Sequence, residues 1–180
     1  MKPQHVYKIG DTFISISAFK SIRIKNIDNL VENIQSLSKV VWIQGVNVMV
    51  IYGFEHIIET LKITLESERR RALLAKKPQV DFLLRLVCTN QISNALQYGG
   101  LKDGRDGCFI ACSKNEGQLS KVSDRLHYLF GRRDETILKP TEIKRKTISE
   151  RLGIGINNNP LKEDIGFLGF LAERGALITR

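Results

Sequence analysis

The chain has 180 residues, of which 42% are apolar and 26% charged, with only 4 prolines. The length suits one domain of ordinary size, and the composition excludes a disordered, collagen-like or disulfide-stapled protein. The longest uncharged stretch, Val40 to Phe54, is too short and too polar to cross a bilayer, so no membrane segment is expected. The N-terminal residues lack the apolar run of a signal peptide, and we expect a cytoplasmic protein.

The charge of the chain indicates a class of partner, and its cysteine content indicates the state of the thiols. Basic residues outnumber acidic ones by 28 to 19, which gives a net charge of +9. This charge favours a polyanionic partner, with nucleic acid as the first class to consider, although many basic proteins only carry solvated lysine-rich faces. The 3 cysteines cannot all pair within the chain, which indicates free thiols.

Periodicity predicts strands in the N-terminal part of the chain. Apolar and polar residues alternate over 12–24, the pattern of a half-buried strand. Apolar spacing over 28–37 predicts a short helix. Two segments rich in Val and Ile, 40–43 and 46–51, predict buried strands that a turn at Gly45 could join as a hairpin.

After residue 53 the apolar period changes to that of helices. Residues 54–75 are predicted as the longest helix, which Pro78 would end. The apolar stretch 80–87 fits either a strand or a buried helix. Residues 92–98 are predicted as a helix that Gly99 and Gly100 would terminate in a left-handed stop.

The C-terminal half continues the alternation of strand and helix. A core strand is predicted over 108–112, a helix over 116–128, a basic helix from Pro140 through Lys146, and a last amphipathic helix over 161–177.

These elements predict a mixed α/β (α+β) fold in which a small mixed β-sheet packs with several helices in a single domain. The expected organisation is a domain over residues 1–152, a linker over 153–160 and a C-terminal helix over 161–180 that packs on the same domain.

No catalytic or metal-binding motif can be named in this sequence. The GxSxG nucleophile motif is missing, and the glycines from Gly99 to Gly104 lack the Lys-Ser/Thr pair of a phosphate-binding loop. Cys108 and Cys112 would lie about 13 Å apart on one strand, too far to share an ion. We therefore expect no enzyme activity, no cofactor and no metal; a small enzyme of unrecognised type would require titratable groups that converge in a pocket.

The strongest local feature is a basic window over residues 69–77. It contains five cations and no acid: Arg69, Arg70, Arg71, Lys76 and Lys77. On a helix, several of these side chains would project toward one phosphate backbone. The alternative is a solvated helix face near a C-terminus, where the helix dipole favours cations. A second basic cluster, 144–146, is flanked by acids and is weaker.

Four short segments carry a family pattern in a fixed order. They are Glu55–Ile58 at a helix start, Phe82–Leu101 with an Asn-Gln-Ile helix start, Thr141–Arg145, and Leu171–Leu177. Together they resemble the small non-catalytic subunit of the KEOPS (EKC) complex, the family of the human PRPK-binding protein and its archaeal and yeast counterparts. The resemblance extends over roughly residues 12–178. The chain departs from it at Asn90, where archaeal members commonly have Arg, and at Asp81, where Glu is usual.

The resemblance implies a subunit without catalysis of its own. Such a subunit binds the N-terminal lobe of the small atypical kinase/ATPase of the complex and regulates it. Related archaeal subunits also bind the single-stranded 3′ CCA end of tRNA and recruit it for synthesis of threonylcarbamoyladenosine (t6A), a reaction performed by the threonylcarbamoyl-transferring subunit. No membrane partner is implied.

The resemblance and the charge pattern together predict two binding surfaces. For RNA we expect the basic window and the turn formed by Asn90, Gln91 and Ile92, whose amides can hydrogen-bond unpaired base edges. For the kinase, a weaker candidate is an apolar face of the last helix with Phe167, Phe170 and Leu171, residues that would also suit a core. The alternative is a protein-only regulator of the kinase that does not bind RNA, as the eukaryote-like Asn90 would fit.

Overall fold

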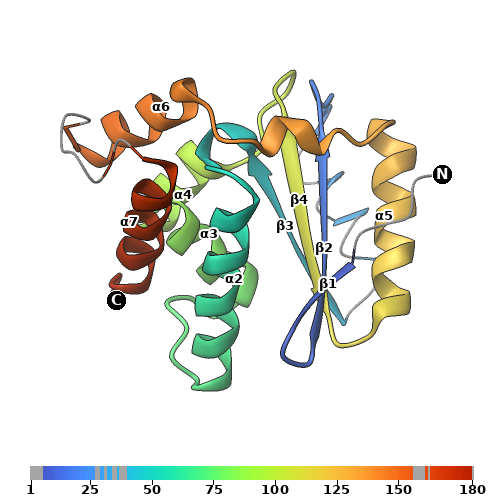
Figure 1. Ribbon diagram of the computed structural model, residues 1–180. Coiled ribbons are helices and arrows are strands. Elements are labelled where there is room, and N and C mark those ends of the chain that lie inside the picture. The colour runs from blue at the N-terminus through green and yellow to red at the C-terminus, as the bar shows by residue number, and fades with distance from the viewer. Residues whose placement is uncertain are drawn as a thin grey trace. The chain divides into compact units, whose positions relative to one another are not determined.

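The computed structural model describes residues 6–26, 29–30, 32–33, 36, 40–155, 161 and 163–179, which form two compact units (Figure 1). The sheet unit is built from Met1–Asn47 and Leu101–Ile137, and the helical unit from Val48–Gly100 and Leu138–Arg180. The predicted mixed α/β class is confirmed. In the described part of the chain no helix is long and apolar enough to span a membrane.

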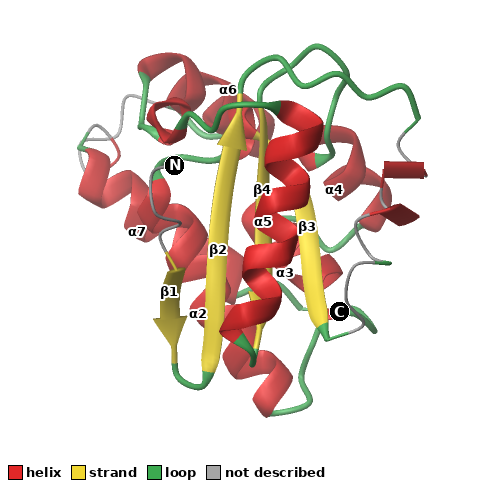
Figure 2. Cartoon of the chain, turned by 90° about the vertical axis from the view of Figure 1, so that its right-hand side faces the viewer, coloured by secondary structure: helices red, strands yellow, loops and turns green. Residues whose placement is uncertain are grey.

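The sheet unit contains a four-stranded sheet in the order β1-β2-β4-β3. Its strands are β1 (Val6–Ile9), β2 (Thr12–Phe19), β3 (Val41–Asn47) and β4 (Gly107–Ser113), and all three pairings are antiparallel. Helix α5 (Glu116–Phe130) lies along one face of the sheet (Figure 2). Its buried residues Leu119, Val122 and Leu126 pack with Phe19 and Phe109 of the sheet.

The N-terminal predictions need correction. Residues 40–51 form one strand, β3, followed by a 3-10 turn, η1 (Val48–Val50), instead of two strands in a hairpin. Gly45 does not turn the chain: a Cβ on this residue would lie 2.5 Å from Cδ1 of Leu101, so the strand needs glycine for close packing. The strand predicted over 12–24 ends at Phe19, and half of the residues of the predicted helix 28–37 lie outside the described part of the chain.

The helical unit is assembled from helices around an apolar core. Its helices are α2 (Phe54–Arg69), α3 (Pro78–Leu86), α4 (Ile92–Gly99), α6 (Glu142–Leu152) and α7 (Asp164–Ala176), and a 3-10 turn, η2 (Glu135–Leu138), spans the chain boundary between the units. Helix α3 packs against α2, α4 and α7. One buried cluster of this unit consists of Tyr52, Ile148, Phe167 and Leu171.

The longest predicted helix ends earlier than expected. Helix α2 stops at Arg69, and Arg71 takes the left-handed conformation with φ 57°. The N–H groups of Arg71 and Ala72 donate to the carbonyls of Glu68 and Ser67, which is the Schellman arrangement that usually requires glycine. The prediction that the helix continues to residue 75 is therefore wrong, and residues 70–77 form a loop.

The glycines at the end of α4 act differently from the prediction. Gly99 is helical, and a Cβ there would lie 2.6 Å from Cγ2 of Val87 and 2.9 Å from Cδ1 of Leu83. Gly100 has φ −64°, so there is no left-handed stop. The close approach of α4 to α3 requires Gly99. The segment 80–87, which fitted a strand or a helix, belongs to helix α3, whose first residue is Pro78.

Candidate nucleic-acid interface

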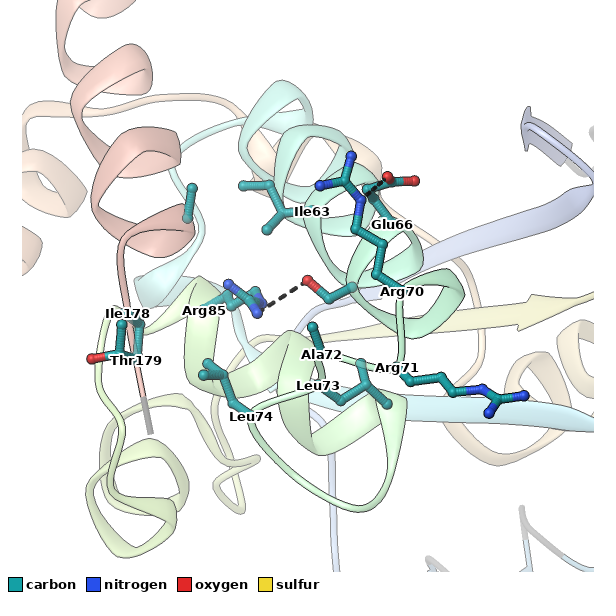
Figure 3. A pocket seen from close by; sticks show the side chains of 12 residues that line it. Ile63, Glu66, Arg70, Arg71, Ala72, Leu73, Leu74, Arg85, Ile178 and Thr179 are labelled. Atoms are coloured by element: carbon teal, nitrogen blue, oxygen red, sulfur yellow. Dashed lines mark hydrogen bonds and ion pairs between the residues drawn. The ribbon is translucent and has the colours of Figure 1, made fainter.

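A pocket of about 650 Å³ lies in the helical unit at the end of α2 (Figure 3). Apolar side chains of Ile63, Leu73, Leu74 and Ile178 contribute to its wall, and none of the described residues that line it is aromatic. Polar groups complete the lining: Glu66, Ser67, Arg70, Arg71, Arg85 and Thr179, together with Ala72 and Ala176. The pocket thus combines an apolar wall with arginines from the predicted basic window.

A buried ion pair holds the loop that forms this pocket. Asp81 is completely buried in α3, and Nε of Arg85 donates to its Oδ2 at 2.8 Å. The Oγ1 of Thr64 donates to the same carboxylate at 2.9 Å, and the N–H of Leu74 donates to Oδ1 at 2.7 Å. The Asp81 carboxylate therefore attaches the loop 70–77 to both α2 and α3.

The guanidinium of Arg85 extends this network to the far wall of the pocket. Its Nη1 donates to the carbonyl of Gly175 at 3.0 Å, and its Nη2 donates to Oγ of Ser67 at 3.1 Å. All three nitrogens of the group have an acceptor, as a buried charge requires. The end of α7 is thereby fixed beside the end of α2, which places Ala176, Ile178 and Thr179 at the pocket.

The cations of the basic window fall into two groups. Arg69 and Arg70 both pair with the carboxylate of Glu66, and these hydrogen bonds lower the pKa of Glu66 to about 2. Arg71, Lys76 and Lys77 are exposed, and among the described residues they form no ion pair. The expectation that several of these cations project from one helix is therefore wrong, because helix α2 ends at Arg69. Three free cations lie on a loop, and two paired ones lie at the end of α2.

The second predicted RNA-contact segment meets the same C-terminal stretch. Gln91 is the N-cap of α4, and Nδ2 of Asn90 donates to the carbonyl of Thr179 at 3.5 Å. Because Thr179 also lines the pocket, the Asn90 turn and the basic loop both border residues 176–179. Ile92 is 51% exposed on α4, one turn before the equally exposed Leu96. The structure thus brings the two predicted clusters to one part of the helical unit.

Most residues of the other predicted clusters are buried. Phe167 and Leu171 are core residues with 1% exposure, so of the three proposed kinase contacts only Phe170 is partly accessible. In the second basic cluster, Arg145 is buried beside the rings of Tyr52 and Phe167, and each ring centroid lies 5.2 Å from its guanidinium carbon. These side chains stabilise the unit from inside.

Of the residues that line the pocket, the sequence analysis predicted only Arg70 and Arg71. Thr179 and Ile178 show no motif, and they reach the site only because α7 ends beside α2. Asp81 and Arg85 carried a detectable pattern, since an acid and a base four residues apart interrupt an otherwise apolar segment.

No family model matches the sequence, and no curated protein matches it either. Within the described residues, no group of three or more His, Cys, Asp or Glu side chains is placed to hold a metal ion.

Proposed function

We propose that this chain is a non-catalytic, cytoplasmic subunit of a KEOPS-type complex that binds the complex's atypical kinase/ATPase and recruits tRNA for t6A modification. In this proposal the 3′ CCA end enters the pocket of the helical unit. The observation that carries the proposal is the combination of an apolar wall with three unpaired cations on the adjoining loop. The order of four family-like segments supports it.

The chemistry of a single-stranded end suits this pocket. Arg71, Lys76 and Lys77 offer charge to successive phosphates, and their contacts release counterions. An unpaired base can pack against Leu73 and Leu74, while amides of the Asn90 turn reach base edges. Since no aromatic side chain lines the pocket, stacking contributes little, and we expect binding to be strongly salt-dependent.

Charge reversal at the three free cations tests this site. The variant Arg71→Glu, Lys76→Glu, Lys77→Glu should lose tRNA retention at moderate salt, because three phosphate contacts become repulsive. In the milder triple Gln variant the plot of log affinity against log salt should flatten by about 2, as expected for three lost contacts to a single strand. The matched control is the variant Lys102→Glu, Lys121→Glu, Arg132→Glu. It replaces three exposed cations of the sheet unit and changes the net charge by the same amount. Equal loss in both variants would refute a local site.

Two further measurements separate the proposal from the protein-only regulator. Full-length tRNA should bind more tightly than tRNA trimmed of its CCA end, and equal affinity would favour the alternative. A pull-down from extract of the source cells should recover a small kinase together with the threonylcarbamoyl-transferring subunit under either reading. Their absence would count against the family assignment itself.

A further inference from the structure

The helical unit contains a further arginine, Arg151, whose guanidinium nitrogens are shielded from solvent but differ from those of Arg85 in their hydrogen bonding. Arg151 lies in the last turn of α6, and its Nε, Nη1 and Nη2 are all shielded from solvent without a hydrogen-bond partner in the described part of the chain. Arg85 has an acceptor for each of these three nitrogens. A buried guanidinium normally pairs with an anion because it offers five N–H donors and a full charge. Arg151 therefore has an unmet requirement for acceptors.

Among the described residues, none supplies a counter-ion to Arg151. Its guanidinium lies over the ring of Tyr98, 5.9 Å from the centroid, and the other groups that act on its charge are Cys88 and Arg174. Burial raises the pKa of the Cys88 thiol to about 11, so this group is neutral at pH 7. Burial, together with the charge of Arg174, lowers the pKa of Arg151. The site is thus positive and contains no carboxylate among the groups that act on it.

His56 adds a second unfilled donor to this region. The N–H of Tyr52 donates to Nδ1 of His56 at 3.2 Å, which assigns the ring proton to Nε2. This Nε2 is buried and has no partner, in a residue that is only 2% exposed. Burial, followed by the charge of Arg151, lowers the pKa of His56 to about 3, so the ring is neutral and its Nε2–H can donate.

These donors match a particular class of ligand. A planar guanidinium binds two oxygens of one anion at once, and the imidazole N–H can bind a third. A water molecule would accept from one or two donors without compensating the charge. The shielding of the nitrogens favours a small group over a polymer backbone, which separates this region from the RNA pocket.

We propose that Arg151 and His56 form a binding site for a phosphate group, taken either from free inorganic phosphate or from a mononucleotide. The site goes beyond the proposed RNA function and does not depend on it, because none of its residues lines the pocket at the end of α2.

Thermal unfolding of the full chain at constant ionic strength tests the proposal, with inorganic phosphate as the probe and chloride as the reference ion. Above Kd, wild-type Tm should rise with the logarithm of phosphate concentration, by roughly 5–10 °C at about a hundredfold excess over Kd. Arg151→Met should remove this response. In phosphate-free buffer this variant should unfold at the same or a higher temperature than wild type, since it no longer buries an uncompensated charge. A merely structural arginine would give a lower Tm instead.

The matched control is Arg70→Gln, Arg71→Gln, which removes two arginines of the RNA pocket and should respond to phosphate as wild type does. Phosphorus NMR gives a second readout that does not depend on stability: the phosphate line should broaden with wild type and stay sharp with Arg151→Met. Binding of 5′-AMP as tight as that of phosphate would assign a nucleotide as the source, and binding of phosphate alone would assign the free ion. An unresponsive wild type, or full response in Arg151→Met, would overturn the proposal.

Discussion

The two units of the molecule differ in what their interiors contain. In the described residues, the buried polar side chains of the sheet unit are hydroxyls and one amide: Thr12, Ser15, Ser17, Asn47, Ser113 and Ser123. The helical unit buries ionisable groups as well, namely His56, Asp81, Arg85, Lys144 and Arg145. Every charged side chain that is buried in the described chain belongs to the helical unit.

This difference indicates where the chain departs from ordinary packing rules. A buried ion pair is weak support for stability, because desolvation cancels much of the attraction, yet removal of one partner is costly. Such groups persist where they fix a geometry, as Asp81 fixes the loop 70–77. The sheet unit follows the usual pattern of an apolar interior with satisfied strands. Violations of local rules concentrate at functional sites, so the helical unit is the better place to look for function.

The largest expected effect comes from breaking the Asp81–Arg85 pair. Asp81→Asn should lower the free energy of unfolding by about 3–5 kcal/mol, because it leaves the Arg85 charge buried without a counter-ion. It should also loosen the loop and weaken tRNA binding. Chemical denaturation at pH 7 and a gel shift measure the two effects.

Ser17→Ala is the corresponding change in the sheet unit. Its Oγ is buried without a partner, so its removal should alter stability by less than about 0.5 kcal/mol. If Ser17→Ala and Asp81→Asn lower the free energy of unfolding by similar amounts, the different interiors of the two units do not contribute differently to stability.

The next effect is acid sensitivity that originates in the helical unit. The pKa of His56 falls to about 3 in the folded chain, below its ordinary value of 6.5, so the unfolded chain binds the proton first as the pH decreases. Its contribution to stability is complete above pH 6.5 and is lost toward pH 3, with a limiting slope of about 1.4 kcal/mol per pH unit. The stability difference between wild type and His56→Gln should therefore shrink by roughly 2 kcal/mol between pH 6.5 and 5.

Hydrogen exchange can locate this effect. Amides of α2 and α6 should lose protection before those of β2 and β4, because no buried histidine lies in the described sheet unit. A stability difference that is independent of pH, or earlier loss in the sheet, would contradict the assignment.

The sequence predicts helices and strands well, but it does not predict which residues the tertiary packing brings together at a site. The patterns of α5 and β4 are strictly local and are found within a few residues of their bounds. The end of α2 could not be found, because Arg71 occupies a position that glycine usually marks. The basic window was visible, but its position beside Thr179 at one pocket depends on how the helices pack. Arg151 reads as an ordinary surface residue, and only burial distinguishes it.

Packing at glycines should show where the two units are alike. Gly99→Ala should cost about 1–3 kcal/mol, because the new Cβ would overlap Val87 and Leu83. Gly45→Ala in the sheet unit should cost a similar amount, because Leu101 lies as close. Gly169→Ala on α7 is the control: its Cβ meets nothing within 4 Å, and loss of a helical glycine should add about 0.5–1 kcal/mol. Thermal unfolding ranks the three, and a stabilised Gly99→Ala would refute the close contact between α4 and α3.

The smallest effect concerns the strained backbone at Arg71. Arg71→Gly should raise the free energy of unfolding by about 1 kcal/mol, because glycine adopts φ 57° without the Cβ penalty, and should weaken tRNA binding by removing one phosphate contact. Arg71→Gln keeps the strain and removes only the charge, so stability should stay unchanged while binding falls equally. Denaturation and salt-dependent gel shifts measure both variants. If both variants bind tRNA as tightly as wild type, the arginine at this strained position does not serve RNA binding. If both bind equally weakly, the chain keeps the strained conformation because the Arg71 charge contacts RNA.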